Sequence, residues 1–139
     1  MVSADHSSGC MCDAGMELGG EPAGFVIKTD TWSVYHSGDT NVFGDMAIID
    51  YLYKPNVLLV NIGGMATMGP EEAGFAVAKL FRHAKTIIPM HYGTFPMLKG
   101  TVAEFKEHLA RFSEEWKRDP IDVVDAHTLQ HNSIPLPLQ

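Results

Sequence analysis

Three side chains in this sequence of 139 residues have the chemistry of metal ligands: His6, Asp39 and His91. Asp39 comes after Gly38 at the end of an apolar segment, and His91 directly follows the apolar segment 85–90. Because open α/β sheets bind their ligands at the carboxyl ends of strands, Asp39 and His91 are expected at one edge of a sheet. Two imidazoles and a carboxylate suit zinc, manganese or iron.

Other interpretations of these residues stay open on residue type and spacing alone. Asp39 fits a turn or capping residue that accepts backbone N–H bonds. His91 fits a hydrogen-bonded loop histidine. His6 with Cys10 and Cys12 is a further possible zinc set, although three ligands at this spacing match no common zinc motif. No serine lies in a strand-to-helix elbow of the GxSxG type, so a metal-activated water is the expected attacking group of any reaction.

The composition predicts a single globular domain over 1–139, with 45% hydrophobic and 19% charged residues. A net charge of −7, from 17 acidic and 10 basic residues, disfavours nucleic acid or an anionic membrane as partner. No apolar run approaches the roughly 20 residues of a membrane-spanning helix, and the first residues lack the features of a signal peptide. Cys10 and Cys12 are expected to be free thiols, and the expected location is cytoplasmic.

Alternating strands and helices predict an α/β fold, in which one mixed β-sheet begins with a hairpin and continues with parallel pairs. About three helices are expected, enough to cover one face of the sheet but not both. Residues 1–23 are expected to be mostly loop, and 127–139 an extended tail. The expected strands are 24–29, 32–38, 57–62, 85–90 and 121–126, and the expected helices are 41–53, 70–83 and 101–117.

The segments "GEPAGFVI", "VYHSGDT", "FGDM", "NIGG", "TMGPEEA" and "IPMHYGTFP", in this order, resemble the metallo-β-lactamase superfamily. The branch they resemble is that of the ascorbate-6-phosphate-lactonase-like metal-dependent hydrolases, and the likeness runs from about residue 3 to about residue 109. It implies a two-metal site at the edge of an αββα sandwich of two sheets. Asp39 would bridge the metals, His6 and His91 would each bind one, and Asp39 and His91 would be catalytic. Tyr92 and Thr94 would lie behind the ligands or contact substrate.

The family's His-x-His-x-Asp-His motif does not occur in these 139 residues, so the chain resembles the C-terminal half of the sandwich. One expectation is part of a hydrolase of a small ester, lactone or phosphate-bearing metabolite. The alternative is a truncated, inactive half-fold that serves as a binding or self-assembly module. A third is a protein that binds one ion through His6, Asp39 and His91. That this chain binds no metal is a further open alternative. The sheet face without helices is expected to form a homodimer.

Overall fold

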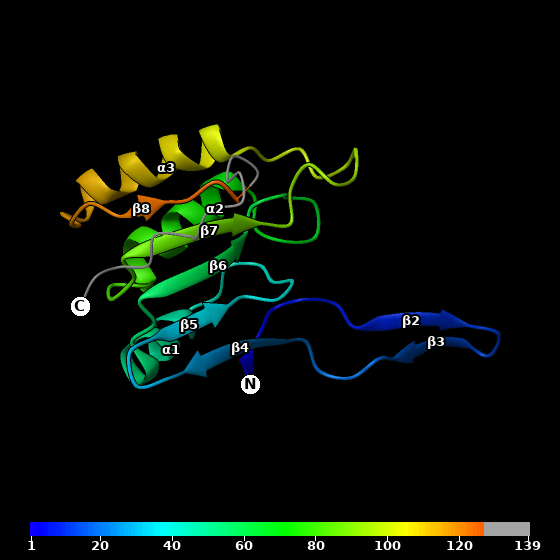
Figure 1. Cartoon of the computed structure of the whole chain (residues 1–139). Helices are drawn as coiled ribbons and strands as arrows, with labels where there is room; N and C mark the ends of the chain where they lie inside the picture. The colour runs from blue at the N-terminus through cyan, green and yellow to red at the C-terminus, as the bar shows by residue number, and fades with distance from the viewer. Residues whose placement is uncertain (127–139) are drawn as a thin grey trace.

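A six-stranded mixed sheet forms the centre of the fold in the computed structural model, which describes residues 1–126 (Figure 1). The strand order is β1-β4-β5-β6-β7-β8. Strands β1, β4 and β5 are antiparallel neighbours, and β5 to β8 run parallel. The predicted hairpin followed by parallel pairs is therefore confirmed. The strands are β1 Val2–Ser3, β4 Ala23–Lys28, β5 Ser33–His36, β6 Val57–Asn61, β7 Thr86–Met90 and β8 Asp122–Val123.

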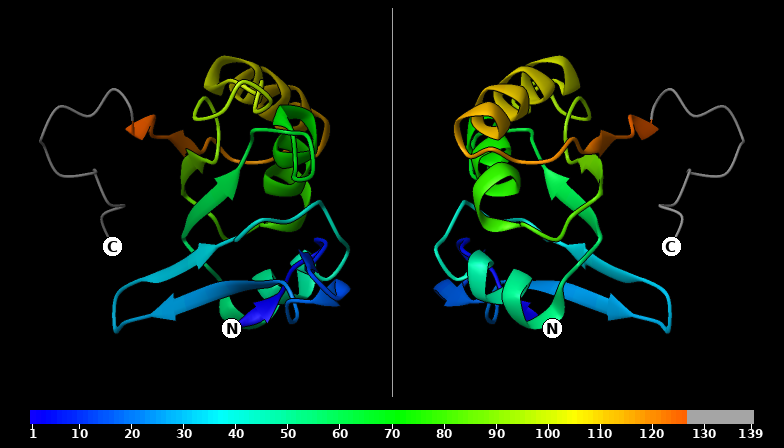
Figure 2. Two further views of the ribbon diagram at one scale, coloured as in Figure 1. Left: turned by 90° about the vertical axis from the view of Figure 1, so that its right-hand side faces the viewer. Right: turned by 90° about the vertical axis from the view of Figure 1, so that its left-hand side faces the viewer.

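The helices lie together on one side of this sheet, as the two side views in Figure 2 show. The predicted arrangement of about three helices on one face is confirmed. Helix α2 continues directly into the π-helical turn η1, and α3 begins at a capping box of Thr101 and Glu104. The bounds are α1 Met46–Tyr53, α2 Pro70–Phe75, η1 Ala76–Leu80 and α3 Val102–Glu115.

Helix α1 begins five residues later than the periodicity of the sequence predicts. The Thr40 hydroxyl accepts the backbone N–H of Asp5 at 2.8 Å and donates to the carbonyl of Asn41 at 2.8 Å. The backbone N–H of Asn41 also donates to the carbonyl of Asp5. These bonds tie 40–41 to the N-terminal segment, so the chain turns into the helix only at Met46.

The hydrophobic core lies between the sheet and the helices. Register places one side chain from each of five adjacent strands in a row facing the helices, and the three central ones are fully buried. Within this row, the Tyr35 ring stacks on Phe81, and the two ring centroids are 4.9 Å apart. Burial raises the pKa of the Tyr35 hydroxyl. The row consists of Val26, Tyr35, Leu58, Ile87 and Val123.

The opposite face of the sheet carries alternate apolar residues that no described helix covers. Phe25 and Ile27 are 49% and 59% exposed, and the other members of this face are half-buried. None of them packs against the core described above. We call this surface the bare sheet face, and it consists of Phe25, Ile27, Val34, Leu59, Ile88 and Met90.

The prediction of a loop over 1–23 is wrong for residues 9–18, which form a β-hairpin of β2 Gly9–Cys12 and β3 Gly15–Leu18 that projects from the body (Figure 1). Gly15, at φ 114°, provides the conformation that the tight turn requires. Glycine is typical of loops, which is why a loop is expected here. In the structure, Gly15 permits the tight turn that brings β2 and β3 together. Met11 and Leu18 are 73% and 88% exposed, so the hairpin contributes little to the core. The expected tail 127–139 lies outside the described residues.

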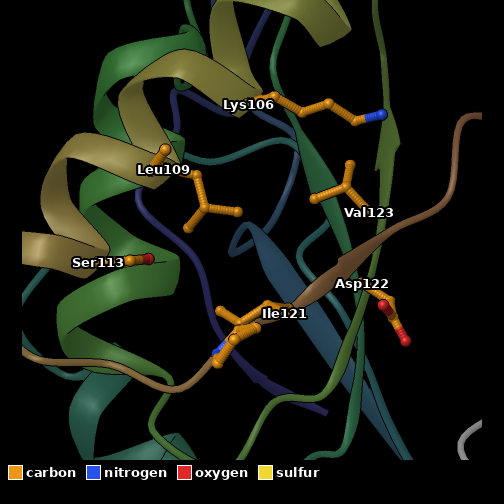
Figure 3. A pocket seen from close by; sticks show the side chains of 8 residues that line it. Lys106, Leu109, Ser113, Ile121, Asp122 and Val123 are labelled. Carbon is orange, nitrogen blue, oxygen red and sulfur yellow. The ribbon is translucent and has the colours of Figure 1, made fainter.

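Strand β8 forms one edge of the sheet and packs beneath α3. Figure 3 shows Ile121 and Val123 on the side of Leu109, around a hollow of about 340 Å³, while the Asp122 carboxylate points away from that helix. Among residues 1–126, no helix is long and apolar enough to cross a membrane.

Candidate metal site

The turn after β5 presents Asp39 at the carboxyl end of the parallel strands. It passes through Gly38 at φ 63°, where an added Cβ atom would collide with the carbonyl oxygen of Ala23. Only glycine therefore fits this turn without strain. The carboxylate that follows is half-exposed, with 52% of the side-chain surface accessible.

His91 reaches the same edge from the end of β7. Its backbone lies in the left-handed region at φ 55°, which is uncommon for a residue other than glycine. Its Nε2 atom is 3.5 Å from Oδ2 of Asp39. Two ligands of one zinc ion, each about 2.0–2.2 Å from it at a tetrahedral angle, lie roughly 3.4 Å apart. The spacing of Asp39 and His91 therefore fits a metal ion held between them.

His6 lines the same hollow, which has a volume of about 180 Å³, together with Asp39 and His91. Its Nδ1 atom is 2.7 Å from the carbonyl oxygen of Ser7. If Nδ1 donates to that carbonyl, Nε2 is unprotonated and available as a ligand, which is the usual arrangement of a metal-binding histidine.

Within residues 1–126, no three histidine, cysteine or acidic side chains gather closely enough to hold one ion. The single-ion set of His6, Asp39 and His91 is therefore not assembled, and neither is the set of His6 with Cys10 and Cys12. Both cysteines are free, exposed thiols on the projecting hairpin. What this part of the chain offers is a close pair of ligands with a third at the rim.

The buried side chain of Asn61 supports the turn that carries Asp39, a role not assigned to it from the sequence. Its amide donates to the carbonyl of Thr40 at 3.0 Å, and its Oδ1 accepts the Ser37 hydroxyl at 2.9 Å. The amide also reaches the carbonyl of Met68 at 3.5 Å. Asn61 thus joins the turn at 37–40 to the loop after β6. A lone amide at the end of the apolar strand "VLLVN" was the available signal.

The outer wall of the hollow is apolar. Met65 and Phe95 are 75% and 60% exposed, and Met97 is 52% exposed. These side chains come from the loops after β6 and β7. They stand beside the Asp39–His91 pair, where they would limit the access of water to a bound ligand.

Tyr92 and Thr94, predicted to lie behind the ligands or contact substrate, are not among the residues that line the hollow. The Tyr92 hydroxyl donates to Asp125 at 2.9 Å, and burial together with this bond raises the pKa of Tyr92 to about 12. The Thr94 hydroxyl lies 3.4 Å from the carbonyl oxygen of Tyr92 and is exposed. Their predicted roles remain predictions.

A sequence model described as the beta-lactamase superfamily domain matches residues 1–92, about two thirds of the chain. The chain belongs to the metallo-β-lactamase superfamily. This membership agrees with the mixed sheet and with the helices on one face. The resemblance noted in the sequence is thereby confirmed at the level of the superfamily.

Several relatives of this chain are described as metal-dependent hydrolases. One from Korarchaeum cryptofilum is 54% identical over 92 residues, which are 66% of this chain and 40% of that protein. One from Methanoculleus marisnigri is 46% identical over 111 residues, 80% of this chain and 49% of that protein. The solved structure of a metallo hydrolase from Ignicoccus hospitalis matches 88% of this chain and 46% of its own with a TM-score of 0.68 and 36% identity. The chain thus spans about half the length of the relatives it matches.

Proposed function

We propose that this chain supplies part of the metal site of a metal-dependent hydrolase in the ascorbate-6-phosphate-lactonase-like branch. The observation that carries the proposal is the approach of His91 Nε2 to Asp39 Oδ2 at 3.5 Å, at the carboxyl edge of the sheet. Metal-dependent hydrolases among the relatives support a divalent ion here. Zinc, manganese and iron all suit imidazole and carboxylate ligands.

Each residue of the hollow has a defined part in this proposal. A bound divalent ion would supply Lewis acidity and lower the pKa of a water molecule. Asp39 and His91 would hold the ion or ions as the catalytic pair, and His6 would add an imidazole from the rim. Asn61 would fix the turn that carries Asp39, and the apolar wall would exclude bulk water. We propose a small ester, lactone or phosphate-bearing metabolite as substrate.

The direct test is metal binding by isothermal titration calorimetry with Zn²⁺, Mn²⁺ and Fe²⁺ on the full chain. Asp39→Asn and His91→Ala should each weaken the affinity at least tenfold, because each removes one of two close ligands. His108→Ala is the matched control, since this histidine lies on α3 and does not line the hollow. Equal affinity in the wild type and both site variants would overturn the proposal. Aryl esters, lactones and phosphate monoesters then form the substrate panel.

A second function, as a self-assembly module, is favoured by the bare sheet face. We propose that a second copy of this chain covers it. The chain matches 46% of the Ignicoccus hospitalis structure. Register also places two polar side chains on this side of the sheet: His36, between Phe25 and Leu59, and Asp122, beside Thr86. Aligned packing of two sheets about 10 Å apart would bury both faces.

We also propose that the protein is located in the cytoplasm. Cys10 and Cys12 are free although both are exposed and stand one residue apart. Thiols of this kind persist in reducing surroundings, which supports a cytoplasmic location.

A further inference from the structure

A hollow of about 610 Å³ lies at the amino-terminal edge of the parallel strands, opposite to the edge that carries Asp39 and His91. It adjoins the start of β7, whose five residues separate it from His91 by roughly 17 Å at 3.3 Å per residue. It is therefore distinct from the candidate metal site. Its charged or titratable lining residues are Arg82, His83, Lys85, Arg118, Asp119 and Asp122.

Arg118 is half-buried, whereas Arg82 and Lys85 are exposed. Its Nη2 atom donates to the carbonyl of Ala84 at 2.8 Å. Its Nε and Nη1 atoms are buried and have no hydrogen-bond partner within residues 1–126. Burial, and then the charge of nearby Arg82, lowers the pKa of Arg118 to about 10. A guanidinium with unsatisfied donors beside a second guanidinium is costly without an anion nearby.

Among residues 1–126, the carboxylates of Asp50 and Asp119 raise the pKa of Arg118 but form no ion pair with it. In the described part of the chain, no carboxylate oxygen lies within 4.0 Å of a side-chain nitrogen of Arg82, Lys85 or Arg118. Asp50 is near, but its carboxylate is buried and accepts both the Nδ1 atom of His83 at 2.8 Å and the backbone N–H of His83 at 3.2 Å. This is unusual for a protein in which acidic residues outnumber basic ones by 17 to 10.

Two acids share the lining with the three cations: Asp119, whose charge acts on Arg118, and Asp122, whose backbone N–H donates to the carbonyl of Lys85. Asp119 and Asp122 nevertheless form no ion pair among the described residues. The hollow therefore combines three cations that form no ion pair within residues 1–126, from two segments: the loop before β7, which carries 82 and 85, and the chain after α3, which carries 118.

We propose that Arg82, Lys85 and Arg118 form a binding site for a phosphate group, either inorganic phosphate or the phosphate of a small metabolite. A phosphate carries up to two charges and several acceptor oxygens, so one group would serve two guanidinium groups and an ammonium together. A carboxylate has one charge and would leave most of these donors unmatched. The bound phosphate would offset the repulsion between Arg82 and Arg118. Its oxygens would accept hydrogen bonds from the guanidinium and ammonium N–H groups that reach the hollow.

The test is calorimetric titration of the metal-free full chain with inorganic phosphate at pH 8, in EDTA and at constant ionic strength. The wild type should bind saturably, and Arg82→Gln and Arg118→Gln should each weaken binding at least fivefold. Arg111→Gln is the matched control, because this arginine pairs with Glu71 at 2.6 Å on the exposed surface and should bind like the wild type. Asp39→Asn should also leave phosphate binding unchanged.

Two further measurements keep the result interpretable. Circular dichroism checks that each variant is folded, and Arg82→Gln decides the outcome if Arg118→Gln does not fold, because Arg82 is exposed. Glycerol phosphate distinguishes the two sources of phosphate: tighter binding than inorganic phosphate indicates a metabolite, and weaker binding the free ion. Non-saturable binding, equal binding by Arg82→Gln, or equally strong binding of acetate would overturn the proposal.

Discussion

At the scale of single residues, Asn61 is the buried side chain that supports the candidate metal site. It is fully buried and connects the turn that bears Asp39 with the loop that contributes Met65 and Met68. A buried amide with three partners specifies one conformation for both segments. Its influence on the metal would therefore pass through the position of Asp39 and not through direct contact.

Asn61→Ala should lower the free energy of unfolding by about 2 kcal/mol, because it leaves buried partners of the amide unsatisfied. Metal affinity should fall as well, since Asp39 loses its support. Urea denaturation followed by circular dichroism measures the first effect and calorimetry the second. Asn41→Ala, at an exposed position, is the control and should change little. Unchanged stability in Asn61→Ala would contradict the assigned role.

The backbone conformation of His91 lowers the stability of the fold, yet this residue is a candidate metal ligand. A left-handed conformation costs a non-glycine residue about 1–2 kcal/mol. His91 nevertheless occupies it at φ 55°, with its ring toward Asp39. Strain of this kind is concentrated at functional sites.

His91→Gly and His91→Ala remove the same imidazole but differ in this strain. Both should weaken metal binding to the same degree, whereas His91→Gly should be more stable than His91→Ala by about 1 kcal/mol. Thermal unfolding of the two metal-free variants tests the difference. An alanine variant as stable as the glycine variant would show that position 91 is not strained.

At the scale of secondary structure, local signals located most elements, and the ends of elements depended on tertiary bonds. Helix α3 starts close to the predicted position 101, because its capping box joins Thr101 and Glu104, which are only three residues apart. The start of α1 shifted, because Thr40 bonds to Asp5, 35 residues away. The sequence does not predict hairpin β2–β3, because its residues show no clear alternation of buried and exposed positions.

Thr101→Ala should destabilise the protein by about 1 kcal/mol, since it removes the side-chain acceptor of the Glu104 N–H at the start of α3. Thr101→Ser keeps the hydroxyl and should be close to the wild type. Chemical denaturation compares the three proteins. A serine variant as unstable as the alanine variant would assign the effect to the lost methyl group and not to the cap.

For the whole molecule, the two faces of the sheet have different surroundings. One face is packed against α1, α2, η1 and α3, and the bare sheet face exposes large apolar side chains such as Phe25 and Ile27. A contiguous apolar patch of this kind marks an interface more often than an ordinary surface. The proposed second copy would cover it.

Ile27→Lys should convert the proposed dimer to a monomer, because the charge would be buried between two sheets. Ile48→Lys is the matched control: Ile48 is 54% exposed on α1, which packs on the other side of the sheet, and its substitution should leave the dimer intact. Sedimentation velocity at micromolar concentration distinguishes the two states. A wild type that is monomeric at this concentration would refute the dimer.

The sequence alone determined the alternation of strands and helices, the parallel order after the first hairpin, and the superfamily. It also placed Asp39 and His91 at strand ends, because periodicity and turn residues are local properties of the chain. Only the tertiary structure decided that these two side chains lie 3.5 Å apart, that Asn61 supports one of them, and that Arg82 and Arg118 line one hollow. These contacts join residues distant in sequence, and strand order, register and side-chain packing bring them together, which no local pattern specifies.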